Sequence, residues 1–267
     1  MAKLQHTDEV TTTYADTALD EAARAAASAG VVVRSMFEPV ELDAMRATIE
    51  SVWGPEVVPP RNVLRGLALG GAGLMLALRD GEAIGFSLGW LGWNGGVHLH
   101  SHQVGVLPGV RGAGVGFALK LAQRAECLRH GITEMRWTYD PIVATVASFN
   151  LLRLGTTVLG FHPNCYGERR DAFNTGDITD RLEVSWRLDA QVGGRSIDPG
   201  GRDVIVVPAD YQQLRDDNPA HARELRRRVG EQLAALFAAG GSIVGLGRQH
   251  GDVGYVVTLE SADRATD

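Results

Sequence analysis

A glycine-rich loop between a predicted strand and a predicted helix has the residue types needed to bind an anionic group. A helix start leaves backbone N–H groups without intrahelical partners and carries partial positive charge, so it can hold phosphate oxygens. Glycines let the backbone approach a bulky anion, and an arginine adds a cationic fork of donors. The pattern therefore predicts a phosphate or pyrophosphate site that needs no metal. The loop consists of Arg111, Gly112, Ala113, Gly114, Val115 and Gly116.

The elements on either side fit this interpretation. Residues 98–106 read as a strand, and Gly105 near its end has no side chain to keep a ligand from the backbone. After the loop, apolar residues from Phe117 to Leu128 recur at the spacing of one helix face, and Gly131 supplies a stop signal. Strand, loop and helix together predict that the anion lies at the helix N-terminus.

Two other phosphate-binding loops fit less well. A dinucleotide-binding turn requires Gly-x-Gly-x-x-Gly, and the spacing of Gly112, Gly114 and Gly116 differs. A P-loop requires Lys followed by Ser or Thr after the glycines, and neither follows. A tight turn that binds nothing is the remaining structural alternative.

The loop and its flanks resemble the GNAT superfamily of N-acetyltransferases, in the (Arg/Gln)-x-x-Gly-x-(Gly/Ala) signature and the Val-x-Val-x-Pro strand end before it. The resemblance implies that the loop amides hold the pyrophosphate of acetyl-CoA or another acyl-CoA. It also implies that the backbone of Val104, Gly105 and Val106 binds the pantetheine arm and that no metal is required. An asparagine that commonly contacts CoA near the start of a later helix is not at the expected position, and Asn150, within that predicted helix, is the candidate for it.

The order of predicted elements from residue 31 to residue 188 also resembles that superfamily. The fold class expected is therefore α/β (α+β): a mixed, mostly antiparallel twisted sheet flanked by helices, with a small C-terminal α/β extension. Two stretches, His100-Ser101-His102 and the one from Trp137 to Pro141, resemble a poorly characterised bacterial branch of predicted acetyltransferases.

Three segments are expected along the chain. Residues 1–28 form a polar and helical extension, in which the alanine-rich residues 19–29 favour helix. Residues 29–190 form the acyl-CoA-binding catalytic domain, and residues 191–267 form the extension. Arg226, Arg227 and Arg228 in that extension are expected on a solvated helix face.

Composition limits the partners. A net charge of −6 and a pI near 5.8 argue against nucleic acid. The N-terminus lacks the pattern of a secretory signal, and no apolar run is long enough for a membrane span, so a cytoplasmic protein is expected. Cys127 and Cys165 do not form a disulfide framework and are not expected to be nucleophiles. The expected partners are an acyl-CoA and a small-molecule amine, with the chain as monomer or homodimer.

Amide formation from a thioester requires a base for the acceptor ammonium and an acid for the departing thiolate. In the histone-acetylating branch that the sequence resembles, a glutamate six residues before the last valine of the strand is the base. His100 holds that position, and an imidazole, with a reference pKa of about 6.5, accepts a proton at neutral pH. His98, His100 and His102 alternate along the strand, so all three are expected on one strand face. His100 is the first candidate for the base, and His102 is the second.

The acid is harder to assign. The tyrosine that the superfamily often uses is replaced by Leu151. Tyr139 and Tyr166 are candidates by location, and Tyr166 is retained as a catalytic candidate. Asp140 is a candidate for binding the acceptor amine.

The predicted function is acyl transfer, most simply of acetyl, from acyl-CoA to a small-molecule or amino-acid-like amine in a ternary complex. A catalytically degenerate acyl-CoA sensor is the non-enzymatic alternative, because the usual acid is missing. A metal-dependent hydrolase with His98, His100 and His102 as ligands is a third possibility, which leaves the glycine loop without a purpose.

Overall fold

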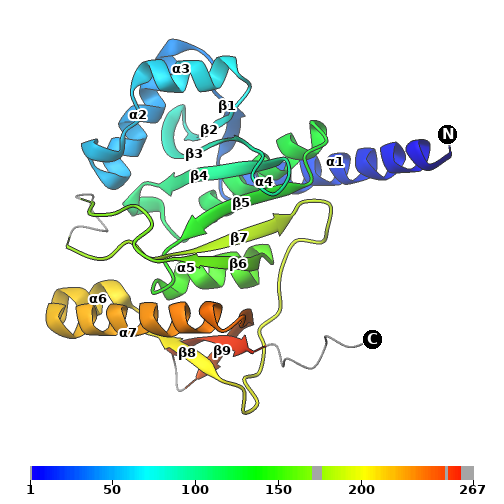
Figure 1. Ribbon diagram of the computed structural model, residues 1–267. Coiled ribbons are helices and arrows are strands. Elements are labelled where there is room, and N and C mark those ends of the chain that lie inside the picture. The colour runs from blue at the N-terminus through cyan, green and yellow to red at the C-terminus, as the bar shows by residue number, and fades with distance from the viewer. Residues whose placement is uncertain (1, 170–175, 250–251, 260–267) are drawn as a thin grey trace. The chain divides into compact units, whose positions relative to one another are not determined.

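The computed structural model describes residues 2–169, 176–249 and 252–259 (Figure 1). These residues form a mixed α/β fold with a mostly antiparallel sheet flanked by helices, as the sequence predicted. The chain divides into two compact units, and each is treated by itself. Residues 2–137 and 187–190 belong to unit 1, and the other described residues belong to unit 2.

Unit 1 contains a sheet whose strands follow the order β1-β2-β3-β4-β5, antiparallel except for the parallel pair β4 and β5. Its last strand, β5, begins in unit 1 and ends in unit 2. The elements are α1 (Ala2–Ser28), β1 (Val32–Ser35), α2 (Pro39–Trp53), η1 (Pro55–Val57), α3 (Arg61–Leu69), β2 (Gly73–Arg79), β3 (Glu82–Gly92), β4 (His98–Val106), η2 (Pro108–Val110), α4 (Val115–Arg129) and β5 (Glu134–Tyr139).

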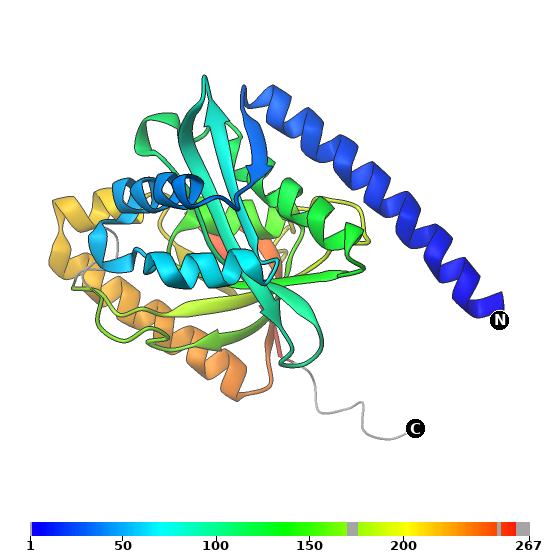
Figure 2. The same ribbon diagram turned by 90° about the horizontal axis from the view of Figure 1, so that it is seen from above.

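Alternation along β2 shows how the unit 1 sheet separates two cores. Leu74 and Leu76 pack with the buried residues of α2 and α3. Met75 and Ala77, which point the other way, pack with those of α4 and the end of α1. The turn of the β2–β3 hairpin, Asp80-Gly81, has positive φ at both residues, as a two-residue hairpin turn requires. Both faces of the sheet are therefore covered (Figure 2).

Helix α1 is longer than the sequence predicted. Helical propensity favoured residues 19–29, whereas the helix begins at Ala2. Adding a residue to an existing helix costs much less than nucleating one, so polar residues can continue a helix that an alanine-rich segment starts. The C-terminal part of α1 packs along α4.

Arg124 of α4 fixes this packing. Its side chain is 2% exposed and donates to the carbonyls of Leu188 and Ala190, at 2.8 and 3.2 Å. It also forms an ion pair with Glu21 of α1. One buried guanidinium thus connects α1, α4 and the segment of residues 187–190 within unit 1.

Unit 2 contains the antiparallel pair of β6 and β7 and a three-stranded antiparallel sheet in the order β8-β10-β9. The helix that the sequence predicted around Asn150 is α-helical in its first half and π-helical in its second half, which contains Asn150. The elements are α5 (Ala144–Ser148), η3 (Phe149–Leu154), β6 (Thr157–His162), β7 (Arg181–Arg187), β8 (Val204–Val207), α6 (Tyr211–Asp217), α7 (Pro219–Ala238), β9 (Ser242–Gln249) and β10 (Asp252–Thr258).

Substituting Arg124 should lower the stability of the protein markedly. Arg124→Ala leaves the buried carbonyl of Leu188 and the carbonyl of Ala190 without this donor and removes the partner of Glu21, so the free energy of unfolding should fall by about 3 kcal/mol. Arg129→Ala, on the exposed end of the same helix, should change it by no more than about 0.5 kcal/mol. Urea unfolding followed by circular dichroism measures both. Equal effects of the two substitutions would contradict the role given to Arg124.

Candidate active site

The predicted anion-binding loop has the backbone geometry that the sequence indicated. Gly112 and Gly114 both have φ of +82°, a conformation that other residues rarely adopt. Gly114 is the N-cap residue of α4, and no side chain caps the helix there. Val115, the first helical residue, buries its side chain in the core and so anchors the helix start. Arg111 precedes the glycines on the exposed side of the loop. The loop therefore presents main chain at an uncapped helix N-terminus.

Strand β4 leads into this loop with one edge largely unpaired. On one side β4 pairs with β3 from His98 to Val106. On the other side, its pairing with β5 covers Leu99 with Met135 and His100 with Arg136. In the described part of the chain, residues 101–106 have no partner on β5, so the two strands separate after His100. Half of the N–H and C=O groups of this segment are directed toward the open edge.

Packing by itself requires glycine at position 105. A Cβ built at this position would lie 2.5 Å from a ring carbon of Phe86, which is fully buried. The sequence interpretation, that the missing side chain exposes the backbone to a ligand, overlooked this ring on the neighbouring strand. Val104 and Val106 direct their side chains into the core shared with α4. What these residues can offer a ligand is their backbone.

A β-bulge in β4 lies beside the two histidines that contact Trp90. Leu88 pairs with Gln103 and Trp90 pairs with His100, so β4 contains one more residue than β3 in this interval. His100 and His102 lie on the same side of the strand, and both lie against Trp90, with ring centroids 5.4 and 4.8 Å from that of the indole.

The three strand histidines do not converge on a common point. The rings of His100 and His102 lie 5.8 Å apart, whereas Nδ1 of His98 is 2.8 Å from the carbonyl oxygen of Gly96. Among the residues that the structure describes, no three His, Cys, Asp or Glu side chains are close enough together to hold a metal ion. The geometry therefore gives the hydrolase alternative no ligand set.

A buried lysine that sequence reasoning missed lies where β4 and β5 separate. Lys120 of α4 donates to Ser101 Oγ at 2.8 Å, and its Nζ lies 3.4 Å from the ring centroid of Trp137. Ser101 in turn donates to Gln123 Oε1 at 2.9 Å. Burial lowers the pKa of Lys120 well below its ordinary value. A lysine at a helical position that periodicity assigns to the core was the available signal.

Asp140, proposed to bind the acceptor amine, already has a cationic partner. Arg226 donates to both of its carboxylate oxygens, at 3.1 and 2.9 Å, and the main chain of Ile142 donates to Oδ1. The side chain of Arg226 is 5% exposed and also pairs with Asp177, so its assignment to a solvated face was wrong. Arg227, the next residue, is exposed and fits that assignment.

The tyrosine candidates differ in exposure. Tyr166 is partly exposed, and its hydroxyl lies 3.0 Å from Thr138 Oγ1 on β5. Tyr139 is buried, and burial raises its pKa above the ordinary range. Asn150 is buried within η3, and its main-chain carbonyl accepts hydrogen bonds from the main-chain N–H groups of Gly155 and Thr156. Among the four catalytic candidates, His100 and His102 belong to unit 1, and Asp140 and Tyr166 belong to unit 2.

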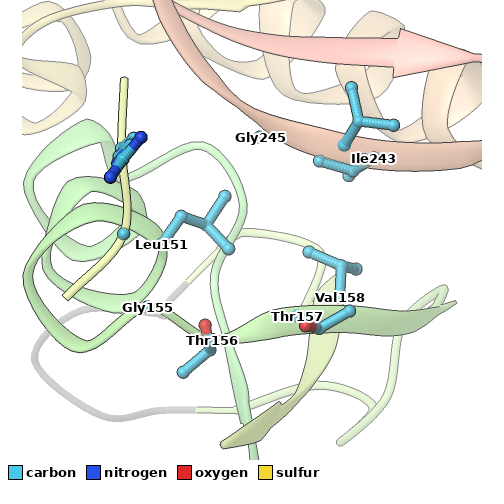
Figure 3. Close-up of a pocket in the computed structure, with 10 residues that line it drawn as sticks. Leu151, Gly155, Thr156, Thr157, Val158, Ile243 and Gly245 are labelled. Carbon is cyan, nitrogen blue, oxygen red and sulfur yellow. The ribbon is translucent and has the colours of Figure 1, made fainter. Parts of the chain in front are cut away.

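Unit 2 contains a cavity of about 170 Å³ that the sequence did not indicate (Figure 3). None of the predicted site residues lines it. Leu151, at the position where the superfamily resemblance leads one to expect a tyrosine, is part of its wall. The lining residues are Leu151, Gly155, Thr156, Thr157, Val158, Gly194, Arg195, Ile243, Val244 and Gly245.

Residues 42–155 match the model of the acetyltransferase (GNAT) family. Among curated proteins, none matches the chain. Similar solved structures include Arabidopsis thaliana Naa50 in complex with a bisubstrate analogue, with 18% identity, a TM-score of 0.48 and coverage of 58% of this chain and 97% of that one. Another is ribosomal-protein-alanine N-acetyltransferase from Brucella melitensis, with 20% identity, a TM-score of 0.42 and coverage of 58% and 99%. In the described residues, no helix is both long enough and apolar enough to cross a membrane.

Replacing Lys120 with a neutral side chain of similar length should stabilise the protein. Burial lowers the pKa of Lys120 in the folded protein, whereas in the unfolded chain this pKa is about 10.4. Between the two pKa values the unfolded chain binds more protons, so the stability of the wild type rises with pH in this window. Lys120→Met should therefore raise the free energy of unfolding by roughly 1–3 kcal/mol at pH 7, and the gain should shrink toward pH 10. Thermal unfolding at several pH values measures this. A pH-independent difference would contradict the assignment.

Proposed function

We propose that this chain, whose residues 42–155 carry the acetyltransferase (GNAT) family region, transfers an acyl group from acyl-CoA to the amine of a small-molecule or amino-acid-like acceptor. The observation that carries the proposal is the uncapped N-terminus of α4, preceded by two glycines in the left-handed conformation, immediately after the open edge of β4. Acyl-CoA is the cosubstrate that fits both features.

The phosphate end of the cosubstrate matches the loop. A pyrophosphate carries negative charge and many acceptor oxygens, and the first turn of α4 supplies N–H groups and the positive end of a helix dipole. Arg111 adds a charged donor on the exposed side of the loop. The region fits such a group, because the backbone at Gly112 has open space around it.

The pantetheine arm matches the open edge of β4. Its two amides can form the hydrogen bonds that a neighbouring strand would otherwise provide to residues 101–106. This segment covers roughly 17 Å at about 3.3 Å per residue. An extended arm that starts at the loop spans this distance, and its thioester would then lie near Ser101 and the bulge.

The chemistry then requires proton transfer near the bulge. His100 takes a proton from the acceptor ammonium, directly or through water, and the free amine attacks the thioester carbon. The new C–N bond forms, the C–S bond breaks and the departing thiolate takes up a proton. His102, which shares the contact with Trp90, is the second candidate for the base. Tyr166 remains the candidate acid, and the carboxylate of Asp140 is assigned to Arg226 rather than to the acceptor.

Binding of the cosubstrate should depend on the loop. Arg111→Ala should weaken acetyl-CoA binding about tenfold, since a charge-assisted hydrogen bond is worth roughly 1.5–3 kcal/mol. Gly114→Ala should weaken it as well, because Gly114 has positive φ at the helix start. Gly131→Ala has a similar backbone cost, with φ of +71° at the other end of α4, and serves as the control. Calorimetric titration measures all three. An equal loss with Gly131→Ala would count against the loop at residues 111–116 as the binding site.

Turnover should depend on His100 without a matching change in cosubstrate affinity. His100→Gln should lower kcat by about a hundredfold or more, the usual contribution of a general base, whereas acetyl-CoA binding stays within twofold. His130→Gln, on the exposed end of α4, is the control. Steady-state rates with a panel of amines measure the effect. Cosubstrate binding without turnover on any amine would favour the degenerate sensor instead.

A further inference from the structure

Lys120 lies at the point where β4 and β5 separate. The last paired residues are His100 on β4 and Arg136 on β5, so Ser101 and Trp137 are the first residues beyond the pairing. The Nζ atom of Lys120 contacts both of these side chains. It approaches from α4, the side of the sheet on which Ser101 is buried. A buried amine therefore marks the closed end of the open edge of β4.

Hydrogen-bond donors at this position exceed the acceptors around them. Lys120 is 3% exposed, and its polar contacts are with Ser101 Oγ and, at 3.7 Å, with the weak acceptor Met135 Sδ. In the described residues, no carboxylate lies within ion-pair distance of it. Gln123 accepts from Ser101 and is fully buried, and its amide nitrogen lies beside Gly89 of β3, on the other side of β4 from the open edge. Because buried polar groups are nearly always paired in proteins, the unused donors of Lys120 point to an acceptor supplied by a ligand.

The acceptor that complements a buried amine is a carboxylate. Resting on the proposed function, we propose that Lys120, held in place by the hydrogen-bonded pair of Ser101 and Gln123, forms the terminal subsite for an acyl group that ends in a carboxylate. The chain would then use a dicarboxylic acyl-CoA, such as succinyl-CoA, in preference to an acyl-CoA with an apolar end. This assignment identifies the class of acyl group, which the loop and strand leave open.

The arrangement of the open edge places this subsite at the correct end of the cosubstrate. The arm runs from the loop at residues 111–116 along β4, and its thioester reaches Ser101. The acyl group extends past the thioester toward Lys120. A carboxylate there accepts hydrogen bonds from the amine, and its charge favours the ammonium form of Lys120 against the cost of burial. An apolar acyl end leaves the amine without this partner.

The test compares two acyl-CoAs of equal chain length. Succinyl-CoA and butyryl-CoA both have a four-carbon acyl group and differ in the terminal carboxylate. Calorimetric titration of the full chain should show at least tenfold tighter binding of succinyl-CoA, and Lys120→Met should abolish or reverse this preference. The affinity for free CoA should stay unchanged, because the subsite contacts the acyl end alone. Ser101→Ala and Gln123→Leu, which remove the hydrogen bonds that hold Lys120 in place, should each reduce the preference and provide independent variants.

The outcomes separate this inference from the proposed function. Equal binding of succinyl-CoA and butyryl-CoA by the wild type would overturn the carboxylate subsite and leave the acyltransferase proposal intact. A preference for succinyl-CoA that persists in all folded variants would place the carboxylate elsewhere and also overturn it. Failure of free CoA and both esters to bind would remove the proposed function and the subsite together.

Discussion

The separation of β4 from β5 is the constraint on which the rest of the candidate site depends. Two residue pairs hold these parallel strands together, and β4 then continues for six residues without β5. Backbone N–H and C=O groups need partners whenever they are not in water, so an open edge inside a sheet is sustained only where a ligand or solvent can reach it. The loop, the bulge and the buried lysine all lie along this edge, where a bound ligand could contact each of them.

Packing fixes the two ends of the edge. At the loop end, Val115 anchors the first turn of α4 in the core, and Phe86 occupies the space where a side chain at residue 105 would lie. At the closed end, His100 and His102 lie against Trp90, while Ser101 is directed toward α4. A rigid scaffold of this kind positions a flexible arm at both its phosphate and its thioester end.

Buried charge is used in two different ways in the two units. In unit 2, Arg226 is paired with Asp140 and Asp177, so its charge is compensated within the protein. In unit 1, Lys120 has a hydroxyl and an aromatic ring as neighbours, and neither cancels a full charge. A compensated pair is a structural feature, whereas an uncompensated buried amine has an electrostatic need that a ligand can meet. For this reason we propose Lys120, and not Arg226, as a group that binds a ligand.

The sequence by itself determined the local elements and the anion-binding loop, because both depend on short-range properties. The strand predicted over residues 98–106 has its observed bounds in β4, and the glycines from Gly112 to Gly116 marked a helix start that main chain alone can offer to an anion. Only the tertiary structure decided which side chains meet across strands. The contact of Phe86 with Gly105, the contact of Trp90 with His102, and the pairing of Asp140 with Arg226, 86 residues away, depend on register and long-range packing. Lys120 illustrates the same limit, since its position on α4 could be read from the sequence, but the absence of a carboxylate beside it in the described residues required the folded neighbours.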